Sequence, residues 1–420
     1  MKNIPLLILW IALLSVEVYV RAQTPPFVRR VTNTPEQSIN LHPVISGDGR
    51  RIAFESSFDL PNNSATRNFQ TVMASLDDGK IIFSKIADSR SASAALSQNG
   101  QQLVFASKDD LLRMNADGNS EIFYFDGERL HQLTDTHPDS TARRAVDGND
   151  HPSVSDDGTL VAFTSNRDLV PGVNADKNFE AFIYEVASKK ITQVTNTIGI
   201  IGCERAEISG DGQSIAYITV NAGDENAASE NRSVMLHSVS SGAVTFSHAT
   251  RGVKLSHSRS LSDNGSRLAF SAPDKTGNAQ IYLYDEARRK IRQITQLTGR
   301  NADEAPSFTI SGDGYRVAFA TTRRVVKEKT DGSVEIYVYD LPAAELMKIT
   351  DAPPEATTEV TLSLSDDGLR LIFNFSRLLS DPAASPEFAD SCESLLRGDA
   401  RLARRGQLRD SERRFPARGS

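Results

Sequence analysis

The chain has 420 residues, of which 39% are hydrophobic and 24% are charged, so disorder throughout its length is excluded. Its formal net charge of −7 provides no general attraction for nucleic acid or anionic lipid. Two cysteines, Cys203 and Cys392, are too few for a disulfide framework or a cysteine-rich zinc site, although one bridge between them stays open.

The first 22 residues have the pattern of a secretory signal peptide. Lys2 precedes an apolar run over residues 4–14, and Ala22 provides a small residue at the expected cleavage point. The apolar run is about half of the roughly 20 residues that a membrane-spanning helix needs. We therefore expect cleavage after Ala22, no membrane span in the mature chain, and a periplasmic or secreted location.

A repeated unit follows. The motif Ser-x-(Asp/Asn)-Gly occurs seven times, at spacings of 51, 58, 54, 53, 49 and 54 residues, and its copies begin at Ser46, Ser97, Ser155, Ser209, Ser262, Ser311 and Ser365. An apolar run such as Ile52-Ala53-Phe54 follows each copy. Asp-Gly or Asn-Gly between two such runs is a strong hairpin signal, because both residues tolerate the positive φ of a type I′ turn.

Most copies continue with two further short strands. Examples are residues 280–285 and 335–340 for the third strand, and residues 291–295 and 346–350 for the fourth. Four short strands in about 50 residues, without a helical period, are typical of a propeller blade. The sequence therefore predicts an all-β, seven-bladed β-propeller of four-stranded blades over residues 23–380.

The two ends of this region suggest how the ring closes. Residues 27–34 closely match the fourth-strand segment 191–197, although no first strand precedes them. We expect this N-terminal strand to complete the last blade and so remove an open sheet edge.

The seventh copy lacks an evident third or fourth strand of its own. Residues 381–420 instead form an Arg-rich tail with eight arginines after residue 393, and this composition favours a disordered basic tail. A docked helix over residues 394–409 and an aberrant C-terminus remain open alternatives.

The repeat resembles a known family. The unit Ser-x-Asp-Gly-x-x-(Ile/Val/Leu)-Ala-Phe, followed by Ile-Tyr-x-Tyr-Asp and Gln-(Ile/Val/Leu)-Thr, is similar to the WD40-like PD40 repeats of TolB-type β-propellers. The usual Pro after the serine is replaced here by Gly, Asp or Gln. We find no residues for TolB's additional α/β domain before the first blade, so the resemblance does not imply Tol–Pal membership.

The sequence does not predict the catalytic residues of a serine peptidase. TolB-like propellers also occur beside serine peptidase domains, but Gly-x-Ser-x-Gly is absent and no α/β segment follows the seventh copy.

Channel-mouth candidates come from the starts of the expected inner strands. His42 and His151 stand four residues before their serines, His257 stands five before, and Arg205 occupies an equivalent position. Converging imidazoles could bind a divalent metal, as in propeller enzymes that resemble pectate-fragment lyases. The alternative is that His-Pro only caps a strand.

Two loops are calcium candidates, because side-chain oxygens recur at alternate positions. A polar hairpin connection explains the same residues, which are Asn115, Asp117, Asn119, Glu121, Asn174, Asp176, Asn178 and Glu180. We expect no cofactor other than this possible Ca²⁺.

The sequence thus favours an exported, monomeric propeller that acts as a scaffold for a protein or an envelope polymer, without a role in nucleic-acid binding. The alternative function is a metal-dependent propeller lyase or hydrolase acting on an acidic saccharide.

Overall fold

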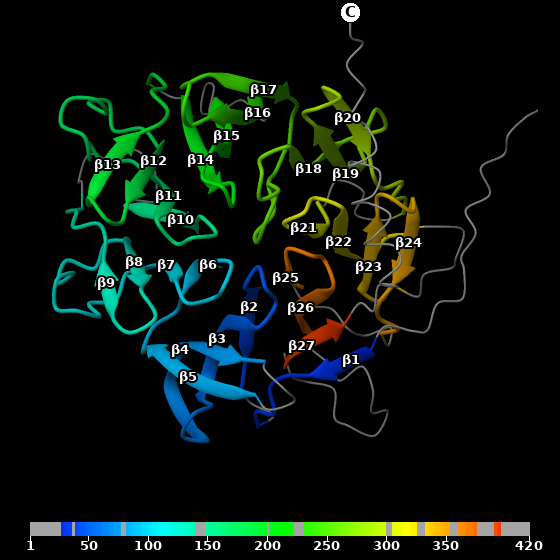
Figure 1. The fold of residues 1–420 in the computed structure, drawn as a ribbon, viewed down its shortest axis with the longest axis horizontal. Helices are drawn as coiled ribbons and strands as arrows, with labels where there is room; N and C mark the ends of the chain where they lie inside the picture. Colours follow the sequence, from blue (N-terminus) through cyan, green and yellow to red (C-terminus); the bar gives the residue numbers. More distant parts are fainter. Residues whose placement is uncertain are drawn as a thin grey trace, which may run out of the picture.

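The computed structural model describes residues 27–35, 38–76, 81–138, 148–199, 201–221, 231–299, 305–325, 332–352, 360–375 and 390–395. The regular elements in these ranges are β-strands, grouped into separate sheets around a ring (Figure 1). Within the same ranges, no helix is long and apolar enough to cross a membrane. The expected signal peptide lies outside the described residues.

Five sheets are four-stranded and use consecutive strands. The first has β2 (Asn40–Ile45), β3 (Arg51–Asp59), β4 (Ser64–Ser75) and β5 (Ile82–Ala87). The second has β6 (Ala92–Leu96), β7 (Leu103–Ser107), β8 (Glu121–Phe125) and β9 (Leu130–Gln132). The third has β10 (Asn149–Val154), β11 (Leu160–Ser165), β12 (Glu180–Glu185) and β13 (Lys190–Gln193).

The other two of these five sheets lie further along the chain. One has β14 (Ile201–Ile208), β15 (Ser214–Asn221), β16 (Asn231–Ser238) and β17 (Val244–Ala249). The other has β21 (Ser307–Ile310), β22 (Arg316–Thr321), β23 (Glu335–Asp340) and β24 (Glu345–Lys348).

The sheet between them has only three strands, β18 (Arg267–Pro273), β19 (Ala279–Asp285) and β20 (Lys290–Gln293). Where a first strand was expected, only isolated bridges from Lys254 to Ser271 and from Leu261 to Leu268 occur. Between these bridges the polar run over residues 256–260 has no apolar residue to bury, and Ser256 N bonds to Ser260 Oγ at 2.7 Å. The chain therefore turns here instead of extending.

The last sheet joins the two ends of the described chain. Its order is β1-β27-β26-β25, built from β1 (Phe27–Arg30), β27 (Asp390–Leu395), β26 (Arg370–Phe375) and β25 (Leu362–Leu364). β27 pairs with β26 on one side and with β1 on the other, both antiparallel. β1 thus forms the outer edge of this sheet (Figure 1).

The predicted seven-bladed propeller of four-stranded blades is therefore wrong. The described residues form six complete, four-stranded blades, and the β18–β20 sheet lacks a first strand. The expected absence of a third strand in the last repeat is also wrong, because β27 supplies it from within residues 381–420. The remainder of that expected tail lies outside the described residues.

The repeated turns differ in detail from the expected type I′ geometry. Gly49 has a φ of 72°, whereas Asp48 is not among the residues with positive φ. Ser46 Oγ donates to Asp48 Oδ1 at 2.7 Å and accepts from Arg51 N at 3.0 Å. This is the pattern of a type I turn followed by a left-handed glycine, in which the serine hydroxyl ties both ends of the turn together.

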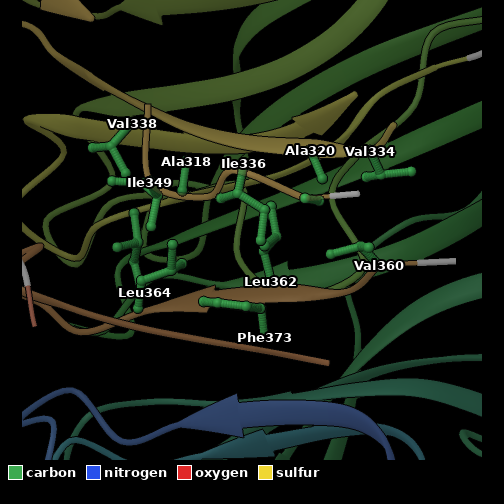
Figure 2. Packing of buried hydrophobic residues seen from close by; sticks show 12 residues of the cluster. Ala318, Ala320, Val334, Ile336, Val338, Ile349, Val360, Leu362, Leu364 and Phe373 are labelled. Carbon is green, nitrogen blue, oxygen red and sulfur yellow. The ribbon is translucent and has the colours of Figure 1, made fainter. Parts of the chain in front are cut away.

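The core consists of apolar clusters between neighbouring sheets. Figure 2 shows the cluster in which Ile336 and Val338 of β23 face Leu362, Leu364 and Phe373 of the last sheet. These side chains are almost fully buried, and burial of each stabilises the fold by about 1.5–3 kcal/mol relative to exposure. Each sheet therefore depends on its neighbours for stability.

Candidate functional site

Four successive inner strands carry the same local distortion. The pairing of β2, β6, β10 and β14 with the next strand shifts register at a β-bulge. The left-handed residues at these bulges have φ values of 51–54° and are His42, Ser93, His151 and Arg205. A bulge redirects a side chain, and non-glycine residues adopt this conformation uncommonly. Three of the four channel-mouth candidates therefore occupy one structural position.

His42 belongs to a charged group beside the first bulge. Its Nδ1 lies 3.6 Å from Glu55 Oε1, and Arg90 Nε donates to Glu55 Oε2 at 2.8 Å. Burial alone would raise the pKa of Glu55, but the hydrogen bonds and charges of His42 and Arg90 outweigh it and lower this pKa. Glu55 is thus held as a carboxylate.

His257 and Arg205 meet across two sheets. Arg205 Nη2 donates to His257 Nδ1 at 2.9 Å, and Arg205 Nη1 donates to the carbonyl oxygen of Ser256. Burial, together with the charge of Arg205, lowers the pKa of His257 to about 4. His257 is therefore neutral near pH 7, with its proton on Nε2 because Nδ1 accepts. His257 lies in no strand, contrary to the expectation that it begins one.

His151 is also neutral. Burial lowers its pKa, and Asp150, whose Oδ2 lies 3.4 Å from His151 Nδ1, opposes this shift only in part. His42 and His151 lie close enough to His257 that protonation of either ring would disfavour protonation of His257. However, the three imidazoles do not form a group of mutually adjacent metal ligands within the described ranges.

The polar segment that replaces a first strand is anchored beside these residues. Glu207 Oε1 accepts from the backbone nitrogens of Ser260 and Leu261 at 2.7 and 2.8 Å. Figure 1 shows the chain between β17 and β18 reaching toward the middle of the ring. Arg259 lies in this segment and forms an ion pair with Asp366, in the turn between β25 and β26.

The seven Ser-x-(Asp/Asn)-Gly turns form a closed circle of main-chain hydrogen bonds. Each bond is 2.8–3.0 Å long and joins neighbouring turns. The donors are the nitrogens of Asp48, Gln98, Asp156, Asp211, Asp263, Asp313 and Asp366, and the acceptors are the oxygens of Gln98, Asp156, Gly210, Asp263, Gly312, Asp366 and Gly47, respectively. The turns therefore surround the axis at the ends of the inner strands opposite the bulges.

Inside this circle Arg259 meets three carboxylates. Oxygen atoms of Asp156, Asp263 and Asp366 lie within 4.8 Å of one another, and this is the one such group among the described residues. Arg259 Nη1 lies 2.5 Å from Asp366 and 3.3 Å from Asp263. Burial and the neighbouring carboxylates raise the pKa of Asp156 to about 6 and that of Asp263 to about 7, although Arg259 opposes both shifts.

Glycines make room for these carboxylates. An added Cβ at Gly47, Gly210 or Gly312 would overlap Asp366, Asp156 or Asp263, respectively. The second position of the Ser-x-(Asp/Asn)-Gly motif holds only Gly, Asp or Gln. This restriction is the sequence signal that the cluster leaves. Arg259 was missed because no motif links it to carboxylates about a hundred residues away.

The calcium candidates lie in two loops with matching geometry. Asn115 Nδ2 donates to the carbonyl oxygens of Lys108 and Asn119 at 3.2 and 2.9 Å, and Asn174 Nδ2 bonds the carbonyls of Arg167 and Asn178 at the same distances. Asp117 pairs with His137 at 2.9 Å, while Asp176 accepts from Gly199 N at 2.7 Å.

Glu121 and Glu180, at the ends of the two motifs, have structural partners. Each is fully buried and accepts from a threonine hydroxyl of the following connection, from Thr134 and Thr195, respectively. Within the part of the chain that the structure describes, the Oδ1 atoms of Asn115, Asn119, Asn174 and Asn178 have no hydrogen-bond partner. Calcium binding at these loops stays a prediction.

Cys203 is a free, buried cysteine whose Sγ lies 3.3 Å from Thr195 Oγ1, and burial raises the pKa of its thiol. The side chain of Cys392 lies outside the described residues.

A separate cavity of about 340 Å³ lies between the β6–β9 and β10–β13 sheets. It reaches the group around the axis at Asp150, the neighbour of His151. Its lining residues are Arg90, Ala92, Ala106, Ser107, Lys108, Asp109, Ser120, Gly148, Asn149 and Asp150.

The ring of sheets and its charged axis define a β-propeller protein, and comparison with solved structures agrees. An oligogalacturonate lyase in complex with manganese superposes with a TM-score of 0.56 at 14% identity, over 91% of this chain and 96% of that chain. The β-propeller domain of the Trilobed protease from Pyrococcus furiosus has a TM-score of 0.50 at 11% identity, over 86% of this chain and 98% of the other.

TolB from Acinetobacter baumannii is more distant, with a TM-score of 0.41 at 17% identity over 73% of this chain and 64% of TolB. At these identities the likeness establishes the fold alone. No family model matches the sequence, and no curated protein matches it. Assignment of the repeats to the PD40 family stays a prediction.

Proposed function

We propose that this chain is a binding scaffold whose ligand, a protein segment or an envelope polymer, docks at the axis on the face that carries the bulges. The observation that supports this function is the set of four equivalent left-handed residues, His42, Ser93, His151 and Arg205. Each such residue costs roughly 1–2 kcal/mol relative to ordinary backbone, and backbone strain of this kind clusters at ligand sites. Structural need alone would favour glycine at these positions.

The electrostatics of this face suit a ligand with polar or anionic groups. Arg205 keeps its charge among neutral imidazoles, and His257 offers an Nε2–H donor while Arg205 occupies its Nδ1. Buried donors that are fixed in place lose little entropy on binding, so they favour specific recognition. The opposite face is occupied by the circle of turns and by Arg259.

A direct test is capture of partners from an envelope extract. The double variant Arg205→Gln/His257→Asn should lose most of the captured partner, because the charge of Arg205 and the Nε2–H donor of His257 are both removed. Arg289→Gln, an exposed charge change in the turn between β19 and β20, should capture as the parent does. Equal capture by both variants would contradict docking at the axis.

Export is part of the same proposal and depends on the leader-like residues 1–22. Fractionation of cells that express the full chain should recover it outside the cytoplasm, beginning at Gln23. A full-length product in the cytoplasmic fraction would contradict export.

The second candidate function is a metal-dependent lyase or hydrolase acting on an acidic saccharide. The observation that favours it is the neutrality of His151 and His257, since metal ligation requires unprotonated imidazole. Elemental analysis should then find about one equivalent of manganese or zinc in the parent, and His42→Ala/His151→Ala should lose it together with cleavage of an acidic oligosaccharide. The scaffold function predicts no stoichiometric metal in the parent.

A further inference from the structure

The cavity between the β6–β9 and β10–β13 sheets has hydrogen-bond donors that the protein does not use. The backbone carbonyl of Lys108 accepts from Asn115 Nδ2, but its side-chain ammonium makes no hydrogen bond or ion pair with the described residues. Among the described residues, the guanidinium of Arg90 donates through Nε alone, to Glu55, while its guanidinium carbon lies 4.8 Å above the ring of Phe69. Two cationic groups therefore border the cavity with unused N–H groups.

The two carboxylates of the lining already have partners. Asp109 Oδ2 accepts from Ser89 Oγ at 2.6 Å, and Asp150 Oδ1 accepts from His151 N at 2.7 Å. The acids are engaged, whereas the exposed Lys108 ammonium and the Nη atoms of Arg90 have no protein acceptor among the described residues, so the lining favours an anionic ligand. Carboxylates meet this requirement well, since charge-assisted hydrogen bonds from Arg and Lys are the stronger ones.

The walls limit what else the ligand can carry. Ala92, Ala106 and Gly148 present little or no side chain, and Gly148 has a φ of 115° with Ser120 O only 2.7 Å from where a Cβ would lie. The volume is at the lower end of the roughly 300–1,000 Å³ of small-molecule sites. The cavity thus accommodates a small apolar group beside the anion.

The hydroxyls of the lining disfavour a sugar. Ser107 Oγ is engaged with Ser89 Oγ at 2.7 Å and with Asp109 N at 3.0 Å, while Ser120 Oγ donates to Asn149 O at 2.7 Å. The ring hydroxyls of a uronic acid would therefore lose water without gaining comparable partners, which is costly.

From these contacts we infer that the cavity binds the C-terminal carboxylate of a peptide, held by Arg90 and Lys108, with a small last side chain against Ala92 and Ala106. The remaining lone pairs of Asp150 accept the last amide N–H. This inference rests on the proposed scaffold function and names the partner as a protein end rather than a polymer.

The test uses N-acetyl-alanyl-alanine with a free carboxylate and the same compound as its C-terminal amide, titrated into the full chain and followed by calorimetry or NMR. The free carboxylate should bind, and the amide should bind at least about tenfold more weakly, the worth of one charge-assisted hydrogen bond. Raising the salt concentration should weaken binding of the carboxylate form only.

Variants locate the site. Lys108→Gln should weaken binding of the free carboxylate by about tenfold, and Ala92→Leu should abolish it by filling the cavity without changing charge. Lys275→Gln, an exposed lysine in the equivalent connection between β18 and β19, is the matched control and should bind as the parent does. Thermal melts of each variant confirm that it is folded.

Equal binding of acid and amide, absence of binding, or unchanged binding by Lys108→Gln and Ala92→Leu would overturn the inference. Preferential binding of digalacturonate at this cavity would also overturn it. None of these results affects the partner-capture assay with Arg205→Gln/His257→Asn, so failure of this inference is distinguishable from failure of the scaffold function.

Discussion

Three carboxylates and one guanidinium meet where Asp156, Asp263 and Asp366 surround Arg259, so the group would carry excess negative charge if all were ionised. Like charges at this separation resist joint ionisation. Burial, together with this repulsion, raises the pKa of Asp156 to about 6 and that of Asp263 to about 7. The folded protein therefore binds protons that the unfolded chain releases.

The sign of the resulting pH dependence follows from linkage. Because both pKa values rise on folding from an ordinary 3.8, the folded state holds more protons between about pH 4 and pH 7, and these groups destabilise it progressively as the pH rises through that window. In the parent, the free energy of unfolding measured with urea should fall between pH 5 and pH 8. In Asp263→Asn this fall should be smaller by about 2 kcal/mol, after allowance for partial exposure. An identical fall in both proteins would show that Asp263 binds no extra proton in the folded state.

Removal of the guanidinium should expose the same repulsion directly. Arg259→Gln leaves three partly buried carboxylates without their cation, and we expect it to lower the free energy of unfolding by about 3 kcal/mol at pH 8. Addition of Asp366→Asn should restore part of that loss, because one negative charge is removed. If the changes in the free energy of unfolding of the two single variants simply add in the double variant, Arg259 and Asp366 are not coupled.

At the scale of elements, the last sheet depends on strands from both ends of the chain. β1 pairs with β27 along residues 27–30, and the hydroxyls of Thr32 and Thr34 accept from Asn40 Nδ2 at 3.3 and 3.0 Å. Val31 is 5% exposed and packs in the cluster that contains Ile45 and Phe54. The N-terminal segment is therefore held by pairing, hydrogen bonds and burial together.

Deletion of residues 27–34 should lower the melting temperature by several degrees, because roughly 1–3 kcal/mol of pairing and packing is lost and a sheet edge is exposed. Scanning calorimetry of the deletion variant beside Val31→Ala separates the two effects, since the point variant keeps the strand and loses only burial. If the deletion variant melts no lower than Val31→Ala, pairing of β1 with β27 contributes nothing measurable.

The same elements show what could be read from the sequence. The Ser-x-(Asp/Asn)-Gly motif predicted the hairpins because its glycine is required at a positive φ, as at Gly49. The missing strand before β18 was overlooked because the spacing of the motif is kept there although the residues are polar. β27 was overlooked because its segment lacks the apolar alternation of the other third strands and depends on partners at both edges.

For the whole molecule, the ring brings together residues that no local pattern connects. Sequence position placed His42, His151 and Arg205 at equivalent points, and the bulges show how those points are built. The hydrogen bond between Arg205 and His257, and the ion pair between Arg259 and Asp366, depend on register across several sheets. Such contacts between distant blades form only when the ring is assembled.

The pairing of β1 with β27 also sets an order of events during synthesis. β1 leaves the ribosome first, whereas its partner strand, residues 390–395, is among the last described residues to emerge. The earlier sheets can collapse onto one another while β1 has no partner, so the nascent chain carries an unsatisfied edge until translation is nearly complete. A ribosomal product that stops before residue 390 keeps that edge unpaired, and an unpaired edge is a template for pairing with another chain.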